Sequence, residues 1–217
     1  MSAPTLALID YGSGNLRSAE RALIRAAEES GGAAEIRVTA DPQVVARAER
    51  IVLPGVGAFA ACMAGLAAVP GLIEAMAEAV RGRGAPFLGI CVGMQLLATH
   101  GHEHGVHAGL GWIEGEVMGL IPADHTLKVP QMGWNELQLS RPEHPMLAGL
   151  ATGDHAYFVH SYQFVPSDRA SLVAEVDYGG PVCAMIARDN IAGTQFHPEK
   201  SQRVGLRLLA NFLTWNP

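Results

Sequence analysis

Three short apolar runs without polar alternation constrain the fold of this chain more than any other feature. They are Thr5–Ile9, Ile51–Leu53 and Phe87–Ile90. A strand that is apolar on both faces is typical of a parallel sheet whose two faces are covered by helices. Apolar residues at helical spacing lie between the runs, as at residues 16–27 and 72–80. This alternation predicts an α/β fold with an open, mostly parallel sheet and helices on both faces.

The second half of the chain changes character near Gly111. Its segments are short and punctuated by turns, which is typical of antiparallel or mixed strands added to a sheet. The expected strands are residues 112–118, 135–139, 156–164, 172–176 and 182–187. A last helix is expected from about Ser201 to Thr214. Since the 217 residues contain no linker, repeat or low-complexity tract, we expect one domain spanning residues 1–217.

Charge and cysteine content exclude several classes of protein. The chain has 15 basic and 21 acidic side chains and a net charge of −6, with its arginines scattered. We therefore expect neither a nucleic-acid surface nor a membrane-docking patch. Cys62, Cys91 and Cys183 include no CxxC pair, which argues against a disulfide framework or a thiolate zinc site and favours a reducing cytoplasm. Only 17% of residues are charged, so part of the surface is expected to be covered by another molecule.

One uncharged run could be mistaken for a membrane span. Residues 51–73 carry no charge and are numerous enough to cross a bilayer. Pro54, Pro70 and four glycines interrupt this run, so it fits a strand, a glycine loop and short helices better than one spanning helix. The N-terminus has no basic region before its short apolar run. We expect neither a membrane span nor a signal peptide.

The segment Gly89-Ile-Cys-Val-Gly93 follows an expected buried strand and precedes a helix. A nucleophile flanked in this way by glycines is typical of a sharp strand-to-helix turn, here with cysteine in place of serine. A helix N-terminus favours the thiolate form of Cys91, and the N–H of Val92 would face a developing oxyanion. A cysteine that only fills space is the alternative, and that role is expected for Cys62 and Cys183. The surrounding pattern favours Cys91 as a nucleophile.

A cysteine nucleophile needs a base, and His197-Pro-Glu199 offers one. In an extended segment, residues two apart point the same way, and Pro198 stiffens the backbone. We therefore expect His197 and Glu199 to face one site, where the carboxylate would orient the imidazole. The alternative is a surface turn with a solvated histidine and glutamate. Together with Cys91, the motif indicates a Cys–His–Glu triad.

Two glycine-rich segments follow expected strands. Pro54-Gly-Val-Gly57 lies at the carboxyl end of its strand, where α/β sheets place their sites, and its glycines would let a peptide group reorient. It is a candidate for a second oxyanion donor, with an ordinary turn as the alternative. Gly12 and Gly14 complete no phosphate-binding motif, so nucleotide binding is not expected.

A cluster of histidines could suggest a metal site. The cluster comprises His100, His102, His104 and His107. Because the stretch is interrupted by glycines and expected to be exposed, we expect it to bind no metal, and we expect no cofactor in the protein.

Seven segments resemble one family along nearly the whole chain. They are IDYGSGNLRS at 9–18, LPGVGAF at 53–59, GICVGMQLL at 89–97, GLGWIEG at 109–115, VPQMGWN at 129–135, YFVHSY at 157–162 and GTQFHPEKS at 193–201. The cysteine turn and the HPE motif resemble the class I glutamine amidotransferases. The first segment, the PGVG loop and PQMGWN most resemble the glutaminase subunits of imidazole glycerol phosphate synthase. The chain departs from that family at Val92, where leucine is frequent, and in its histidine cluster.

The resemblance implies a flavodoxin-like core and the hydrolysis of glutamine to glutamate and ammonia through a thioester. Cys91 would be the nucleophile, His197 the base and then the acid, and Glu199 the orienting carboxylate. The implied oxyanion donors are the backbone N–H groups of Val92, Val56 and Gly57. The implied glutamine contacts are Gly55, Gly57, Gln95, Glu103, Ser161 and Tyr162.

The resemblance also implies a partner, a (β/α)8-barrel cyclase subunit that forms a heterodimer with the chain. The cyclase would use the ammonia to make imidazole glycerol phosphate and AICAR. The expected docking residues are Asn15, Trp134 and Lys200. We further hypothesise that the PGVG loop keeps its oxyanion N–H turned away until the partner's substrate site is filled. The alternatives are a stand-alone cysteine hydrolase, the glutaminase subunit of another amidotransferase, or a non-catalytic binding relative.

Overall fold

The computed structural model describes residues 5–31 and 34–217. Its main sheet has nine strands in the order β2-β1-β3-β4-β13-β12-β11-β8-β9. The first five of these strands pair in parallel. They are β2 (Glu35–Thr39), β1 (Thr5–Ile9), β3 (Arg50–Gly55), β4 (Phe87–Cys91) and β13 (Ile191–Thr194). The other four pair antiparallel. They are β12 (Pro181–Arg188), β11 (Leu172–Asp177), β8 (Gln131–Leu139) and β9 (His155–His160).

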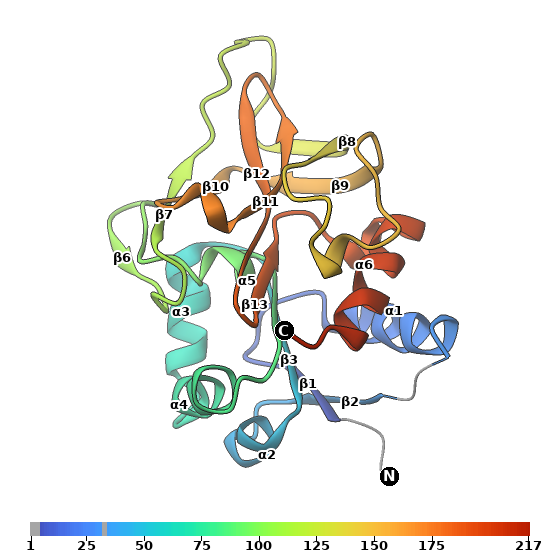
Figure 1. Cartoon of the computed structure of the whole chain (residues 1–217). Coiled ribbons are helices and arrows are strands. Elements are labelled where there is room, and N and C mark those ends of the chain that lie inside the picture. The colour runs from blue at the N-terminus through green and yellow to red at the C-terminus, as the bar shows by residue number, and fades with distance from the viewer. Residues whose placement is uncertain (1–4, 32–33) are drawn as a thin grey trace.

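Helices cover both faces of the parallel strands, as Figure 1 shows. Two pack together on one side, α1 (Leu16–Glu29) and α6 (Gln202–Thr214). On the other side lie α2 (Pro42–Arg47), α3 (Phe59–Ala67) and α4 (Leu72–Ala77), which continues as a π-helical turn, η1 (Glu78–Gly82). The covered faces explain the continuous apolar runs: Leu6 to Ile9 and Phe87 to Leu88 are all at most 1% exposed. The predicted α/β class with a mostly parallel sheet is confirmed.

A second sheet has four strands in the order β10-β7-β5-β6. Its strands are β10 (Tyr162–Pro166), β7 (Gly115–Gly119), β5 (His100–Gly101) and β6 (His107–Ala108). The single strand expected at residues 156–164 is therefore wrong. The chain breaks at Ser161, because β9 pairs with β8 in the main sheet while β10 pairs with β7. The histidine cluster also forms two short strands where none was expected.

The uncharged run at residues 51–73 divides as expected. It contains most of β3, the PGVG loop, α3, a turn and the first residues of α4. Among the described residues, no single helix is long and apolar enough to cross a membrane. The helices Phe59–Ala67 and Leu72–Gly82 meet that test only when counted together, and they are bent by 95° relative to each other.

Substitution of Gly93 by alanine should destabilise the fold. A Cβ at Gly93 would overlap the carbonyl oxygen of Leu53, because α5 (Val92–Gln95) lies directly on β3. We expect Gly93→Ala to lower the free energy of unfolding by about 1–3 kcal/mol or more, as overpacked cores do. Urea denaturation measures the change. In the control Gly119→Ala, the new Cβ would lie 3.9 Å from its nearest neighbour, Tyr162, so little change is expected. Unchanged stability of Gly93→Ala would contradict the close contact.

Candidate active site

Cys91 lies at the turn between β4 and α5. Its backbone has φ 57° and ψ −113°, a conformation that side-chain-bearing residues rarely adopt. A Cβ at Gly89 would collide with the backbone of Gly93, so the turn needs both glycines. Val92 is the first residue of α5, and its N–H therefore has no acceptor within the helix. The sharp turn predicted from Gly-x-Cys-x-Gly is present.

A cavity of about 410 Å³ lies over this turn. It is lined by Asn15, Val56, Gly57, Cys91, Val92, Gln95, Glu103, Pro130, Val159, His160, Ser161, Tyr162, His197 and Lys200. The structure thus brings most of the predicted site residues to one cavity. Three of them do not line it: Gly55, Glu199 and Trp134. Gly55 is buried beside Cys91 in the β3–β4 pairing, and Glu199 lies behind His197.

His197 and Glu199 form a buried pair. Nδ1 of His197 lies 2.8 Å from Oε1 of Glu199, and the two side chains are 3% and 2% exposed. The expected extended segment is wrong, because Pro198–Lys200 forms a short 3-10 turn, η4. This turn folds the carboxylate back onto the imidazole. The two side chains are therefore brought together by the 3-10 turn and not by an extended segment. Ser201 fixes the turn, since its Oγ donates to the carbonyl oxygen of His197 at 2.7 Å.

The pair is charged. Burial by itself would lower the pKa of His197, but its interactions with Cys91 and Glu199 raise that pKa to about 9. Burial would raise the pKa of Glu199, but the imidazolium of His197 and the amide of Asn15 hold it below its usual value. Nδ2 of Asn15 donates to Oε1 of Glu199 at 3.4 Å. Near neutral pH the imidazolium therefore lies beside Cys91, where it can supply a proton to a leaving group.

Sequence reasoning missed Gln195. This residue is fully buried, and its Nε2 donates to Sγ of Cys91 at 3.6 Å. Nε2 of Gln95 donates both to Oε1 of Gln195 at 2.9 Å and to the carbonyl oxygen of Tyr162 at 3.0 Å. The Gln95 amide nitrogen is thus engaged within the protein, which leaves its oxygen to face a ligand. Gln195 precedes His197 by two residues. Because residues two apart in an extended segment point the same way, this spacing could have indicated that Gln195 faces the same site as His197.

The PGVG loop is held by the loop that follows β1. The N–H of Val56 donates to Oγ of Ser13 at 3.0 Å, and the same hydroxyl donates to the carbonyl oxygen of Val56 at 2.7 Å. Sγ of Cys62 also donates to that carbonyl oxygen, at 3.4 Å. Cys62 therefore contacts the loop and does more than fill space, whereas Cys183 is simply buried. The N–H of Val56 is engaged within the protein in this conformation.

The predicted substrate-contact residues come from the second sheet and its loops. Oε2 of Glu103 accepts the N–H of Phe59, at the start of α3, at 2.7 Å. Ser161 and Tyr162 lie where β9 ends and β10 begins. In the neighbouring cluster, His100 and His102 both contact the Glu116 carboxylate, at 3.2 and 2.6 Å. Within residues 5–31 and 34–217, no group of three or more His, Cys, Asp or Glu side chains is arranged to hold a metal ion.

The predicted docking residues lie at the rim of the cavity and beside it. Trp134 is 44% exposed on β8, and its ring meets that of Tyr157 edge-on at 5.9 Å. Nζ of Lys200 lies 5.7 Å from the centre of the Tyr157 ring. Asn15 lines the cavity and contacts Glu199, so a molecule that touches this face would lie next to the buried pair.

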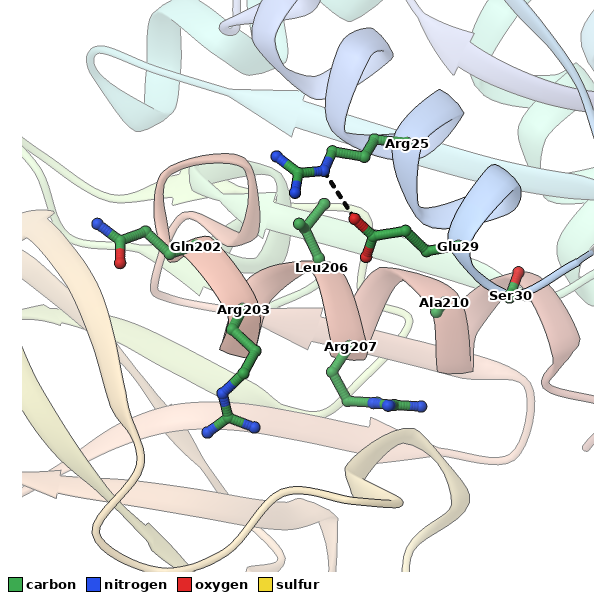
Figure 2. Close-up of a pocket in the computed structure, with 8 residues that line it drawn as sticks. All are labelled: Arg25, Glu29, Ser30, Gln202, Arg203, Leu206, Arg207 and Ala210. Atoms are coloured by element: carbon green, nitrogen blue, oxygen red, sulfur yellow. Dashed lines mark hydrogen bonds and ion pairs between the residues drawn. The ribbon is translucent and has the colours of Figure 1, made fainter.

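A second cavity of about 420 Å³ lies between α1 and α6 (Figure 2). None of the predicted site residues lines it. Figure 2 shows Arg25 turned toward Glu29, with which it forms an ion pair of 2.8 Å, while Arg203 and Arg207 leave α6 on its other side. Because these guanidinium groups do not point toward one another, they cannot bind one anion together. The cavity over Cys91 is therefore the better candidate site.

Comparisons with known proteins agree with this geometry. The profile of the family described as "Glutamine amidotransferase class-I" matches residues 7–215. A relative from Rhodospirillum rubrum, named "Imidazole glycerol phosphate synthase subunit HisH", is 61% identical and covers 98% of this chain and 99% of its own length. A relative of the same name from Caulobacter vibrioides is 60% identical with the same coverage. A solved structure described as a glutamine amidotransferase has a TM-score of 0.69 at 18% identity, over 96% of this chain and 97% of its own, which shows a shared fold.

The buried pair gives a testable pH dependence. Glu199→Gln should lower the pKa of His197 from its value of about 9, because only Cys91 then remains to offset the burial of the imidazolium. A raised histidine pKa stabilises the fold below the unfolded value, and this contribution is lost as the pH rises through the folded value. The variant should therefore be less stable than the wild type by about 2 kcal/mol near pH 6, and the difference should vanish above about pH 9.

Histidine NMR titration and urea denaturation at several pH values measure these two quantities. Glu136→Gln is the matched control, because it removes the carboxylate from an exposed His–Glu pair with His155 at 3.7 Å. An imidazole of His197 that still titrates near pH 9 in Glu199→Gln would contradict the assignment of its charge partner.

Proposed function

This chain belongs to the class I glutamine amidotransferase family, and we propose that it is the glutaminase subunit of an imidazole glycerol phosphate synthase. Relatives that are 56–61% identical over nearly their whole length carry the name of that synthase subunit. The observation that carries the proposal is the strained cysteine turn, which shares one cavity with the imidazole of the buried His197–Glu199 pair. The reaction is the hydrolysis of glutamine to glutamate and ammonia.

In the first half of the reaction, Sγ of Cys91, as a thiolate beside the imidazolium of His197, attacks the carboxamide carbon of glutamine. The N–H of Val92 stabilises the oxyanion of the tetrahedral intermediate, because it is free of helical partners and lies next to the nucleophile. The carbon–nitrogen bond then breaks, and the imidazolium of His197 donates a proton to the leaving nitrogen. Ammonia and a glutamyl thioester result. Glu199 stabilises the imidazolium throughout.

In the second half, water attacks the thioester carbon. His197 removes a proton from the water and becomes the imidazolium again, and the carbon–sulfur bond breaks to give glutamate and the Cys91 thiolate. The hydrogen bond from Gln195 to Sγ stabilises the sulfur whenever it carries negative charge. Glu103, Ser161 and Tyr162 line the cavity and are our candidates for holding the amino-acid end of glutamine.

A cyclase subunit with a (β/α)8 barrel is the proposed partner. Free ammonia is protonated in water and loses its nucleophilicity, so the two sites must be sealed against each other. The docking face that we propose contains Met132 and Trp134 of β8, which are 63% and 44% exposed, together with Asn15 and Lys200 at the cavity rim. Exposed apolar side chains around a polar cavity are suited to such a seal.

The partner also has a part in our hypothesis for the PGVG loop. We propose that docking and filling of the cyclase site turn the N–H of Val56 from Ser13 toward the oxyanion position. Its reciprocal hydrogen bonds with the Ser13 hydroxyl support a held state, and Gly57, with φ 97° and no atom near its missing Cβ, allows the peptide to rotate.

Glutamine hydrolysis is the direct test of the function. The wild-type chain, mixed with a cyclase subunit, should release glutamate and ammonia from glutamine. Cys91→Ala should reduce this rate by a factor of about 10⁴ or more, because the nucleophile is lost. Cys183→Ala, a buried cysteine outside the cavity, is the control and should keep the activity. Cleavage of reporter peptides without glutamine hydrolysis would instead indicate a stand-alone cysteine hydrolase.

Ser13→Ala tests the loop. Without the hydroxyl, the N–H of Val56 loses its acceptor, so glutamine hydrolysis by the isolated chain should rise about fivefold, the factor that one hydrogen bond typically carries. The rate in the complex with a filled cyclase site should change little. Ser18→Ala, on the exposed side of α1, serves as the control. An unchanged rate in isolated Ser13→Ala, or full activity in the isolated wild type, would contradict the held state.

A further inference from the structure

Two buried hydrogen-bond acceptors near the cavity have no use in the mechanism above. Oε1 of Gln131 and Nε2 of His160 have no hydrogen-bond partner among the described residues, and their side chains belong to residues that are 0% and 6% exposed. Such atoms are uncommon in folded proteins, because an unpaired buried acceptor loses its hydration without compensation. Each therefore indicates a position where a small molecule can bind.

The two acceptors share one face of the β8–β9 pair. Gln131 lies directly opposite His160 in the antiparallel register. Side chains at directly opposite positions point to the same side of the sheet, with Cβ atoms about 5 Å apart. Their neighbours Met132 and Val159 point to the other side, where Met132 belongs to the proposed docking face and Val159 borders the cavity. The two unpaired atoms therefore lie on the inner side of the ribbon.

Both atoms can only accept hydrogen bonds. Nδ1 of His160 lies 2.8 Å from the carbonyl oxygen of Tyr162, which cannot donate, so the ring proton is on Nδ1 and Nε2 carries a lone pair. The amide nitrogen of Gln131 donates to Oδ1 of Asn135 at 3.0 Å, which leaves its oxygen as the acceptor. Burial, together with the charge of His197, lowers the pKa of His160 to about 4, so the ring is neutral near pH 7.

The position adjoins the place where the glutamine nitrogen is released. His160 lines the cavity together with Cys91 and His197. Pro130 and Val159, which directly precede Gln131 and His160, line it as well. A molecule bound between the two acceptors would thus lie at the wall of the cavity, on the inner side of the strands that carry Met132 and Trp134.

We propose that Gln131 and His160 form a binding site for the ammonia released at Cys91. Ammonia has three N–H donors and one lone pair, so it can satisfy two acceptors that have no donor beside them. Ammonia is released in the cavity that His160 lines, so it forms next to these acceptors. Neutral acceptors also hold ammonia as NH₃, the form that a cyclase can use, whereas a carboxylate would favour ammonium. This assignment rests on the proposed function.

The test measures how much ammonia reaches the cyclase. Gln131→Met and His160→Leu remove the acceptors with little change in side-chain volume, and both variants are studied in complex with the cyclase subunit. Glutamate and imidazole glycerol phosphate are quantified in the same reaction. Glutamate formation should stay within about twofold, while the ratio of imidazole glycerol phosphate to glutamate should fall about fivefold, with free ammonia appearing in solution.

Two controls separate this effect from misfolding. His144→Leu removes another buried histidine, away from the cavity, and should leave the ratio unchanged. Added ammonium salt should restore the cyclase rate of the two variants to that of the wild type, because it bypasses the glutaminase site. If the cyclase rate of one variant complex is not restored by added ammonium, that substitution has damaged the complex. The other substitution then provides the test.

An unchanged ratio in both variants would overturn the proposal. If glutamyl thioester also accumulates, the acceptors bind the hydrolytic water, and ammonia binding is excluded as their role. A wild-type complex that hydrolyses no glutamine would instead overturn the proposed function. The two failures are therefore distinguishable.

Discussion

The turn at Cys91 is the constraint on which the rest of the site depends. A positive φ at a cysteine is tolerated only because Gly89 and Gly93 let the chain double back against β3. Since β4 lies between β3 and β13 in the sheet, the PGVG loop, the thiol and the segment with His197 all emerge at one edge. Sheet order thus assembles the nucleophile, the base and the proposed second oxyanion donor from three distant parts of the sequence.

One loop reaches both the oxyanion segment and the triad. The loop after β1 places the Ser13 hydroxyl on Val56 and the Asn15 amide on Glu199. Asn15 also lines the cavity rim, within the proposed docking face. A partner that shifts this loop would act on the PGVG loop and on the carboxylate together. The buried imidazolium–carboxylate pair is charged, while the neighbouring His160 stays neutral.

Local patterns in the sequence predicted most of the fold. Thr5–Ile9 is a strand at its expected bounds, and the last helix, expected from about Ser201 to Thr214, spans Gln202–Thr214. These features depend on neighbouring residues alone. The break at Ser161 was not predictable in this way, because pairing with distant strands decides it. Gln195 was missed for the same reason, because its place in the site depends on a hydrogen bond to Cys91, which is 104 positions away in the chain.

Formation of a glutamyl thioester on Cys91 is the central claim, and mass spectrometry after acid quenching during glutamine turnover tests it most directly. The complex with the cyclase subunit should carry one glutamyl group, and peptide mapping should place that group on Cys91 and on neither Cys62 nor Cys183. Turnover without any adduct, or an adduct on another residue, would contradict the account.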